Sequence, residues 1–274
     1  MGSPRHRPTR CLLFFFHAFE TPMELILVTL ASALAGFIDS IVGGGGLILV
    51  PALFAAYPGA HAATLLGTNK SASVWGTLFA AAQYSRRVSL PWPTLWPAML
   101  ASALGSFAGA WLLTLISPQL LRQFLPLVLV VLLLYTLAKK ELGRTHAPRF
   151  AGRREAVVAS LIALVLGTYD GFFGPGTGSF FVFLLVRWLG YDFLNATACT
   201  KLLNLSSNLA ALILLALKGH VWWHMALGLA LANVAGSLLG TRMALKHGAG
   251  FVRLAFIGVV SALILKTGFD ALHL

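Results

Sequence analysis

Long apolar runs separated by short polar stretches form the main pattern of this chain. A membrane-spanning α-helix needs roughly 20 mostly apolar residues in succession, and runs near that length recur. Because the hydrocarbon layer offers no water to bond free backbone groups, such runs must be helical there. Short alternating strands, as in a membrane β-barrel, are not seen, so the predicted class is an all-α, polytopic membrane protein. The pattern predicts uninterrupted spans at Leu65–Tyr84, Thr94–Ile116, Leu120–Ala138, Thr197–Leu217, Trp222–Thr241 and Phe251–Thr267.

Composition and charge agree with a membrane location. Of the 274 residues, 58% are hydrophobic and only 10% are charged, whereas about 25% are charged in an average soluble domain. The formal net charge of +12 would point toward nucleic acid in a soluble protein. Here most Lys and Arg residues lie between the apolar runs, where the cytoplasmic loops of membrane proteins collect them. We therefore expect a lipid bilayer as partner and no nucleic acid.

Two further apolar segments, Met23–Tyr57 and Ala156–Tyr191, are interrupted by glycines, and each carries a carboxylate. The first contains GFIDSIVGGGG, which begins at Gly36, and the second contains GTYDGFFGPGTG, which begins at Gly167. Four glycines in a row exceed what helix packing requires, and a proline ends a helix. We expect each segment to be a hairpin of two short helices around its break.

The interrupted segments belong to an internal repeat. A shift of 131 positions places Asp39 on Asp170 and Lys70 on Lys201, and the register continues without a gap through the glycine pairs downstream. A register that holds at such unusual residues indicates duplication. The predicted units are an N-terminal extension at 1–22, membrane repeats at 23–138 and 156–274, and a polar linker at 139–155.

The orientation of the repeats depends on how the interrupted segments cross the membrane. If each hairpin enters and leaves on one side, each half crosses an odd number of times and the halves are inverted. The basic loops at Arg86–Arg87, Lys139–Arg154, Arg187 and Arg242–Arg253 then share the cytoplasmic side. If each segment crosses once, the halves are parallel and Arg242 faces outward. Because positive residues collect in cytoplasmic loops, the distribution of charge favours inverted repeats and a cytoplasmic linker.

A helix break inside a membrane creates a surface that suits an anion. The break leaves backbone N–H groups without partners, the restarting helix has a partially positive N-terminus, and glycine lets a ligand approach the backbone closely. Breaks at corresponding positions of two halves are typical of transporter binding sites. In contrast, the pairs Gly105–Gly109 and Gly236–Gly240 are explained by helix packing. The candidate cradle residues are Gly43, Gly44, Gly45, Gly46, Gly174, Gly176 and Thr177.

Lys70 and Lys201 place a charge inside predicted spans, which by default marks a substrate or ion pathway. Each begins a polar stripe at i, i+3 and i+7, which is one face of a helix. Two plainer interpretations stay open: each lysine snorkels to the interface, or Asp39 and Asp170 only neutralise the lysines, each aspartate having its own. The aspartates are also candidates for carrying a coupling proton, because burial disfavours a charged carboxylate. The stripes are Lys70, Ser73 and Thr77, and Lys201, Asn204 and Asn208.

These motifs resemble the TauE/SafE sulfite exporter family, also called the four-TMS-duplicated TSUP family, and its YfcA-like branch in particular. The matching stretches are GFIDSIVGGGGLILVPAL with GTNK, and YDGFFGPGTGSFF with ATACTKLLN. The resemblance covers nearly the whole chain from Met23. It implies a multi-pass protein of the cell inner membrane that moves small anions. It carries over as substrate-binding positions both glycine breaks, the Asn69–Lys70 pair, and Thr200–Lys201 with Asn204.

The predicted function is secondary transport of a small anion such as sulfite, sulfoacetate, another organosulfonate or a small organic acid. The P-loop motif is missing, so the chain is not expected to hydrolyse ATP itself. No enzymatic activity and no cofactor are predicted. Cys11 and Cys199 form no metal-ligand pattern. One alternative is a passive anion channel with the same site. Another is an intramembrane aspartyl enzyme, which would need Asp39 and Asp170 to share a proton. A homodimer is also open.

Overall fold

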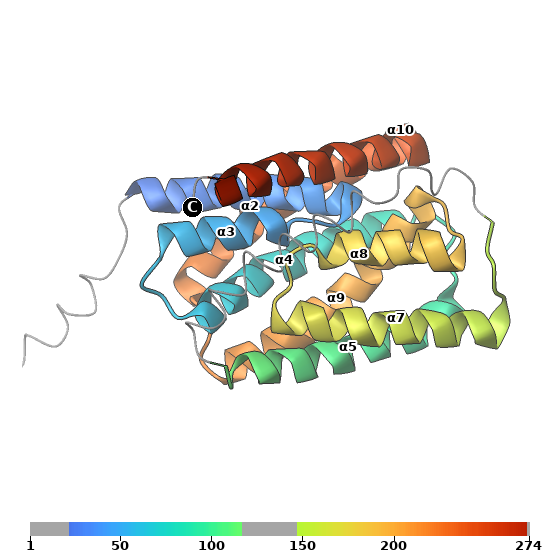
Figure 1. Cartoon of the computed structure of the whole chain (residues 1–274), viewed down its shortest axis with the longest axis horizontal. Helices are drawn as coiled ribbons and strands as arrows, with labels where there is room; N and C mark the ends of the chain where they lie inside the picture. Colours follow the sequence, from blue (N-terminus) through green and yellow to red (C-terminus); the bar gives the residue numbers. More distant parts are fainter. Residues whose placement is uncertain (1–21, 117–146, 273–274) are drawn as a thin grey trace, which may run out of the picture.

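The chain folds into a bundle of helices that lie roughly side by side (Figure 1). The computed structural model describes residues 22–116 and 147–272, with residues 253 and 256–272 as backbone only, and no strand occurs within these ranges. The predicted span Leu120–Ala138, most of the linker 139–155 and nearly all of the extension 1–22 lie outside the described residues. The elements are α2 (Pro22–Val42), α3 (Gly46–Ala56), α4 (Ala62–Ser85), α5 (Trp92–Leu113), α7 (Gly152–Phe172), α8 (Thr177–Leu184), the π-helical turn η1 (Leu185–Leu189), α9 (Phe193–Leu217) and α10 (Trp223–Leu272).

Five of the described helices are long and apolar enough to cross a membrane. They are α2, α5, α7, α9 and the first part of α10. Leucines on their outer sides, such as Leu104, Leu161 and Leu231, are mostly exposed, as side chains facing lipid would be. The class predicted from the apolar pattern, an all-α polytopic membrane protein, is confirmed at this level.

α4 occupies the predicted span Leu65–Tyr84 but differs from the other long helices. It is too polar to count among the five spans, and most of its side chains are buried, including Asn69 and Lys70. Polar side chains inside a bilayer are tolerated where neighbouring protein covers them. The helix is therefore an inner helix of the bundle, wrapped by its neighbours, and not an ordinary lipid-facing span.

The glycine clusters predict that each interrupted segment is a hairpin of two short helices. This prediction is wrong for the first helix of each segment. α2 and α7 each have 21 residues and are full-length spans, whereas α3 has 11 residues and α8 has 8. The reason is that the helix-breaking residues come late in each segment, after an apolar run long enough for a complete span. Each segment thus pairs one long helix with one short one.

α10 contains a break between the two predicted spans Trp222–Thr241 and Phe251–Thr267. Gly248 lies at φ 72° and ψ −166°, which is not a helical conformation. Only glycine adopts such a positive φ without strain. The element is therefore two helices joined at Gly248, in agreement with the two predicted apolar runs.

Small residues hold the long helices together, with α2 against α10 and α5 against α7. A side chain at any of the four glycines of the predicted packing pairs would overlap backbone of the facing helix. Gly105 and Gly109 face α7 at Leu164 and Thr168. The prediction that these four glycines serve helix packing is confirmed: Gly105, Gly109, Gly236 and Gly240.

Candidate functional site

The two glycine breaks meet near the middle of the bundle. Gly43 has a φ of 72°, and a Cβ there would lie 2.5 Å from the carbonyl carbon of Gly178. A Cβ on Gly46 would lie 3.2 Å from the Cα of Pro175. The break after α2 and the break before α8 therefore touch backbone to backbone, and glycine is what permits the approach.

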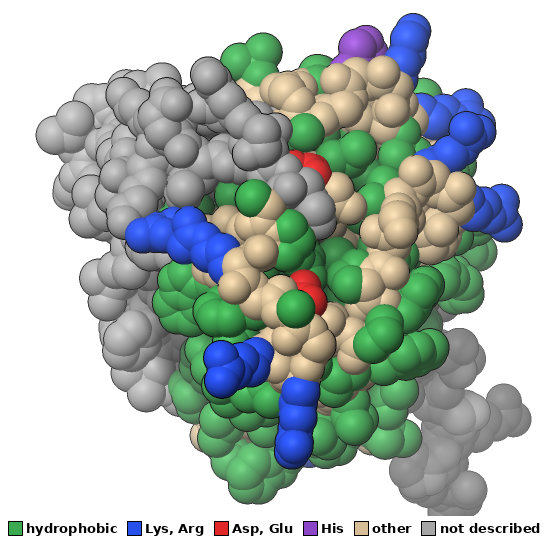
Figure 2. Space-filling model, turned by 90° about the vertical axis from the view of Figure 1, so that its right-hand side faces the viewer, with side chains coloured by type: hydrophobic (Ala, Val, Ile, Leu, Met, Phe, Trp, Pro, Cys, Tyr) green, Lys and Arg blue, Asp and Glu red, His purple; other side chains and the backbone are tan. Residues whose placement is uncertain are grey.

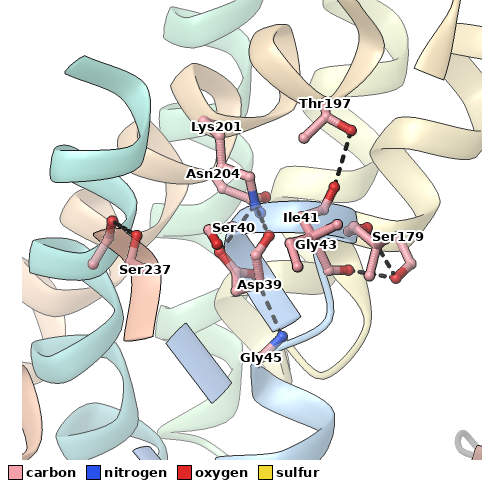
Figure 3. A network of polar contacts seen from close by, with 12 residues as sticks. Asp39, Ser40, Ile41, Gly43, Gly45, Ser179, Thr197, Lys201, Asn204 and Ser237 are labelled. Carbon is pink, nitrogen blue, oxygen red and sulfur yellow. Dashed lines mark hydrogen bonds and ion pairs between the residues drawn. The ribbon is translucent and has the colours of Figure 1, made fainter. Parts of the chain in front are cut away.

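Side chains from other helices bind the carbonyl oxygens at the end of α2 (Figure 3). The last carbonyls of a helix have no partner within the helix, so a buried helix end needs donors from outside. The donors come from α4, α8 and α9, and they hold the break in a defined position. The bonds run from Lys201 Nζ to Asp39 O, from Tyr84 Oη to Ser40 O, from Thr197 Oγ1 to Ile41 O and from Ser179 Oγ to Gly43 O.

Both intramembrane lysines form buried ion pairs. Lys70 Nζ lies 2.8 Å from Asp170 Oδ1, and Lys201 Nζ lies 3.0 Å from Asp39 Oδ2. The residues Lys70 and Lys201 are 2% and 0% exposed, so the interpretation that they snorkel to the interface is wrong. Each lysine pairs with the aspartate of the other predicted half. The equal Asp-to-Lys spacing within each half gives no hint of this exchange.

The two ion pairs differ in their surroundings. Asp170 accepts from Lys70 and, through Oδ2, from Ser207 Oγ at 2.7 Å, and Lys70 also donates to Asn208 Oδ1 at 2.8 Å. Asp39 has the longer ion pair and only a 3.4 Å bond from the Gly45 N–H to its Oδ1. The Asp39 side chain is 21% exposed, against 5% for Asp170. Asp39 is the looser and more accessible carboxylate.

A small polar cavity of about 30 Å³ lies between the breaks and the two ion pairs. Most of the predicted site residues line it. Gly43, Thr200 and Lys201 do not: Gly43 packs against Gly178 where the two breaks touch, Lys201 pairs with Asp39, and Thr200 is fully buried in α9. The lining residues are Asp39, Gly44, Gly45, Gly46, Asn69, Lys70, Ser73, Thr77, Asp170, Gly174, Gly176, Thr177, Gly178, Asn204 and Asn208.

Four lining residues were absent from the predicted site. Ser73, Thr77 and Asn208 belong to the polar stripes that begin at the two lysines, so the i, i+3, i+7 pattern already marked them. Gly178 ends the second glycine motif. The periodic stripe therefore predicts these wall residues better than the family resemblance, which carries over Thr200 instead.

Two amide side chains of the cavity carry an unused hydrogen-bonding atom. Oδ1 of Asn69 and Oδ1 of Asn204 are buried and have no hydrogen-bond partner among the described residues. An unsatisfied buried polar atom costs about 1–3 kcal/mol, and rotating the amide by half a turn exchanges its oxygen and nitrogen. Both groups therefore have capacity to bond a guest in the cavity.

A separate histidine pair lies in the loops at one end of the bundle. The rings of His61 and His220 stack at 5.2 Å with an interplanar angle of 17°, and His220 Nδ1 is 3.3 Å from Thr64 Oγ1. Burial, His61 and the nearby Lys218 hold the pKa of His220 below its usual value near 6.5. This pair joins the start of α4 to the chain that follows α9.

The lowered pKa makes fold stability depend on pH. Because the unfolded chain binds this proton more readily than the folded one, stability is expected to fall as pH drops through and below about 6.5. His220→Gln should flatten that dependence when thermal unfolding in detergent is compared at about pH 8 and about pH 5.5. His247→Gln, in an exposed position on α10, is the matched control and should keep the wild-type slope. An unchanged slope in His220→Gln would contradict the assignment.

Comparison with known proteins places the sequence of this chain in a family. The family model described as Sulfite exporter TauE/SafE matches residues 28–267. A probable membrane transporter protein, YfcA, of Escherichia coli K12 is 37% identical over 254 residues, which cover 92% of each chain. The probable membrane transporter protein ORF9 of Sinorhizobium sp is 35% identical over 249 residues, covering 91% of this chain and 94% of the relative. No solved structure matches. With a family match across most of its length, the chain belongs to the TauE/SafE family of membrane transporters.

Proposed function

We propose that the protein is a secondary transporter that carries a small anion through the cavity between the two glycine breaks. The observation that carries this proposal is the presence of a buried lysine, Lys70, in the wall of a cavity that is also lined by Asn69 and Asn204, whose amides can turn to present N–H donors to an anion. The preferred substrates are sulfite, sulfoacetate, another organosulfonate or a small organic acid. The family name and the transporter names of the relatives agree with transport but select no substrate.

The short helices add to the attraction for an anion. α3 begins at Gly46 and α8 begins at Thr177, and both residues line the cavity. A helix N-terminus carries a partial positive charge and free N–H groups, so oxyanions bind there readily. Two such ends and Lys70 converge on one small volume, which suits one compact anion.

Inverted repeats would explain how the same site opens to either side. α4 begins at Ala62 and α9 at Phe193, 131 positions later, as the sequence shift predicts. The start of α4 lies beside the end of α9, because the Trp222 N–H bonds Thr68 Oγ1 at 3.0 Å, so the two helices run in opposite directions. The exchanged ion pairs are what a pseudo-twofold relation between the halves would produce.

The distribution of basic residues supports a cytoplasmic assignment for one end of the bundle. Figure 2 looks onto the right-hand end of Figure 1 and shows Lys and Arg side chains around its edge. The end of α4, the start of α7 and η1 lie there, with Arg86, Arg154 and Arg187. Cytoplasmic loops collect such residues. We place this end, and the linker, in the cytoplasm, with the protein in the inner membrane.

The competing functions have less support. A passive channel would need a continuous path, whereas this cavity is small and bounded by two ion pairs and two backbone breaks. An aspartyl enzyme would need two carboxylates sharing a proton, but Asp39 and Asp170 each face a lysine. Saturable counterflow separates a carrier from a channel, whose conductance would far exceed carrier rates.

Uptake into proteoliposomes tests the proposal. One of sulfite, sulfoacetate, taurine, sulfate or acetate is expected to show saturable uptake and counterflow. Asn69→Ala and Asn204→Ala should each raise KM for that anion about tenfold, since a hydrogen bond to a charged group contributes about 1.5–3 kcal/mol. Gln83→Ala is the matched control. Gln83 lies in α4 and, like the two asparagines, has a side-chain amide with one buried atom that lacks a partner among the described residues, but it does not line the cavity. Equal KM values in all variants would contradict the site.

A further inference from the structure

The ionised side chains around the cavity cancel. Lys70, Asp39 and Asp170 line it, and Lys201 lies directly behind Asp39. The other elements packed on Asp39 add no charge there: α10 faces α2 with Asn233, Gly236 and Gly240, and α4 contributes the neutral hydroxyl of Tyr84. The empty site is therefore neutral, with two lysines against two aspartates.

An anion that enters a neutral, buried site brings a full charge, which only the partial positive charges at the N-termini of α3 and α8 oppose. Burying an uncompensated charge is strongly unfavourable, and a buried charge persists where it has a partner. The site has no spare cation among the described residues, because each lysine already has its aspartate. Loss of charge by one carboxylate would free a full positive charge to balance the anion, and it therefore favours binding.

The structure distinguishes the two carboxylates. Both oxygens of Asp170 are engaged, one by Lys70 and one by Ser207, and its side chain is 5% exposed. Oδ1 of Asp39 accepts only a long hydrogen bond from the Gly45 N–H among the described residues. The Asp39 side chain is 21% exposed and lines the cavity. If Asp39 became neutral, Lys201 would still donate to the Asp39 carbonyl oxygen (Figure 3). Asp39 is the carboxylate that can change its charge without leaving a lysine unbonded.

We infer that Asp39 takes up one proton whenever an anion occupies the site, so that anion and proton move together and the cycle is electroneutral. This inference rests on the proposed function. The proton passes from cavity water to Asp39 Oδ1 and forms a neutral carboxyl group. Asp170 stays ionised with Lys70, the charge of Lys201 balances the anion, and the loaded site is again neutral. Release of anion and proton on the other side restores the starting state.

The test uses the full chain in proteoliposomes and radiolabelled methanesulfonate, a small organosulfonate whose single charge does not titrate. Counterflow reports translocation without net charge movement. Net uptake is then measured with an internal pH dye while a potassium gradient and ionophore set the membrane potential. We expect about one proton to enter per anion, and an uptake rate that stays the same when the potential is changed.

Two variants isolate Asp39, each checked for a monodisperse profile in detergent. Asp39→Asn should still catalyse counterflow, several-fold more slowly, while its proton-to-anion ratio falls from about one to near zero and its net uptake becomes dependent on potential. Asp39→Glu keeps a carboxyl group and should keep the ratio near one.

The outcomes separate the inference from the proposed function. Wild-type uptake driven by potential without acidification of the lumen, or uptake that requires sodium instead of protons, would overturn the inference and leave the carrier standing. An unchanged proton ratio in Asp39→Asn would also overturn it. Absence of counterflow for methanesulfonate and for every anion of the uptake panel would overturn the proposed function itself.

Discussion

Lys70→Gln is expected to abolish anion transport and to lower the melting temperature by about 10 °C. Adding a second substitution, Asp170→Asn, should restore the melting temperature but not transport. Removing one partner of a buried ion pair costs about 3–5 kcal/mol, because the other charge stays buried without compensation. For a chain of this size, each kcal/mol corresponds to about 2–4 °C. The double variant replaces the pair by two neutral amides and so removes the penalty. Transport stays absent because Lys70 is the lysine that lines the cavity and can contact the anion, whereas Lys201, which balances the anion's charge, lies outside the cavity wall.

The choice of second site tests the exchanged pairing. Asp39→Asn should not rescue Lys70→Gln, although Asp39 has the same sequence relation to Lys70 that Asp170 has to Lys201. Conversely, Asp39→Asn should partly rescue Lys201→Gln. Thermal unfolding in detergent gives the full set of double-mutant couplings. A stronger coupling between Lys70 and Asp39 than between Lys70 and Asp170 would show that the ion pairs form within each half.

The helices and most of the cavity wall could be predicted from local patterns. Apolar runs located α4, α5 and α9, because the thickness of a bilayer imposes a length on each span. A charge in an apolar helix is expensive unless it is covered, so Lys70 and Lys201 indicate an interior from the sequence alone. The polar stripe at three- and four-residue spacing located Ser73 and Asn208 for the same physical reason.

Local sequence patterns could not predict which aspartate pairs with each lysine, or which buried residues line the cavity. Asp39 and Lys70 are related by spacing along one half, but which helices pack together depends on surfaces far apart in the chain. The glycines of α5 face α7, and those of α10 face α2, and this exchange brings Asp170 to Lys70. The sequence likewise could not exclude Thr200, which lies one helical turn before Asn204 on α9 but is fully buried and does not line the cavity.

Gly178→Ala is expected to inactivate transport, because it separates the two glycine breaks. A Cβ at this position would lie 2.6 Å from the Cα of Gly43 and 2.8 Å from Nδ2 of Asn204. Such distances are too short for a Cβ, so the backbone at Gly43 would have to shift. Gly43→Ala should have a similar effect for two reasons, since its φ of 72° adds about 1–2 kcal/mol of strain to the clash. Initial rates of anion counterflow, normalised to folded protein, provide the measurement.

Gly228→Ala separates this effect from a general intolerance of alanine. Gly228 lies in α10, and a Cβ there would have no atom within 4 Å. Alanine has the higher helix propensity by up to about 1 kcal/mol, so this variant should be as stable as the wild type or slightly more so, with unchanged counterflow. If Gly178→Ala behaved like Gly228→Ala, the breaks would not need their close contact, and the cavity would have to be held by the ion pairs and the capped end of α2 alone. If only Gly43→Ala lost activity, the strain of its backbone and not the contact would be the requirement.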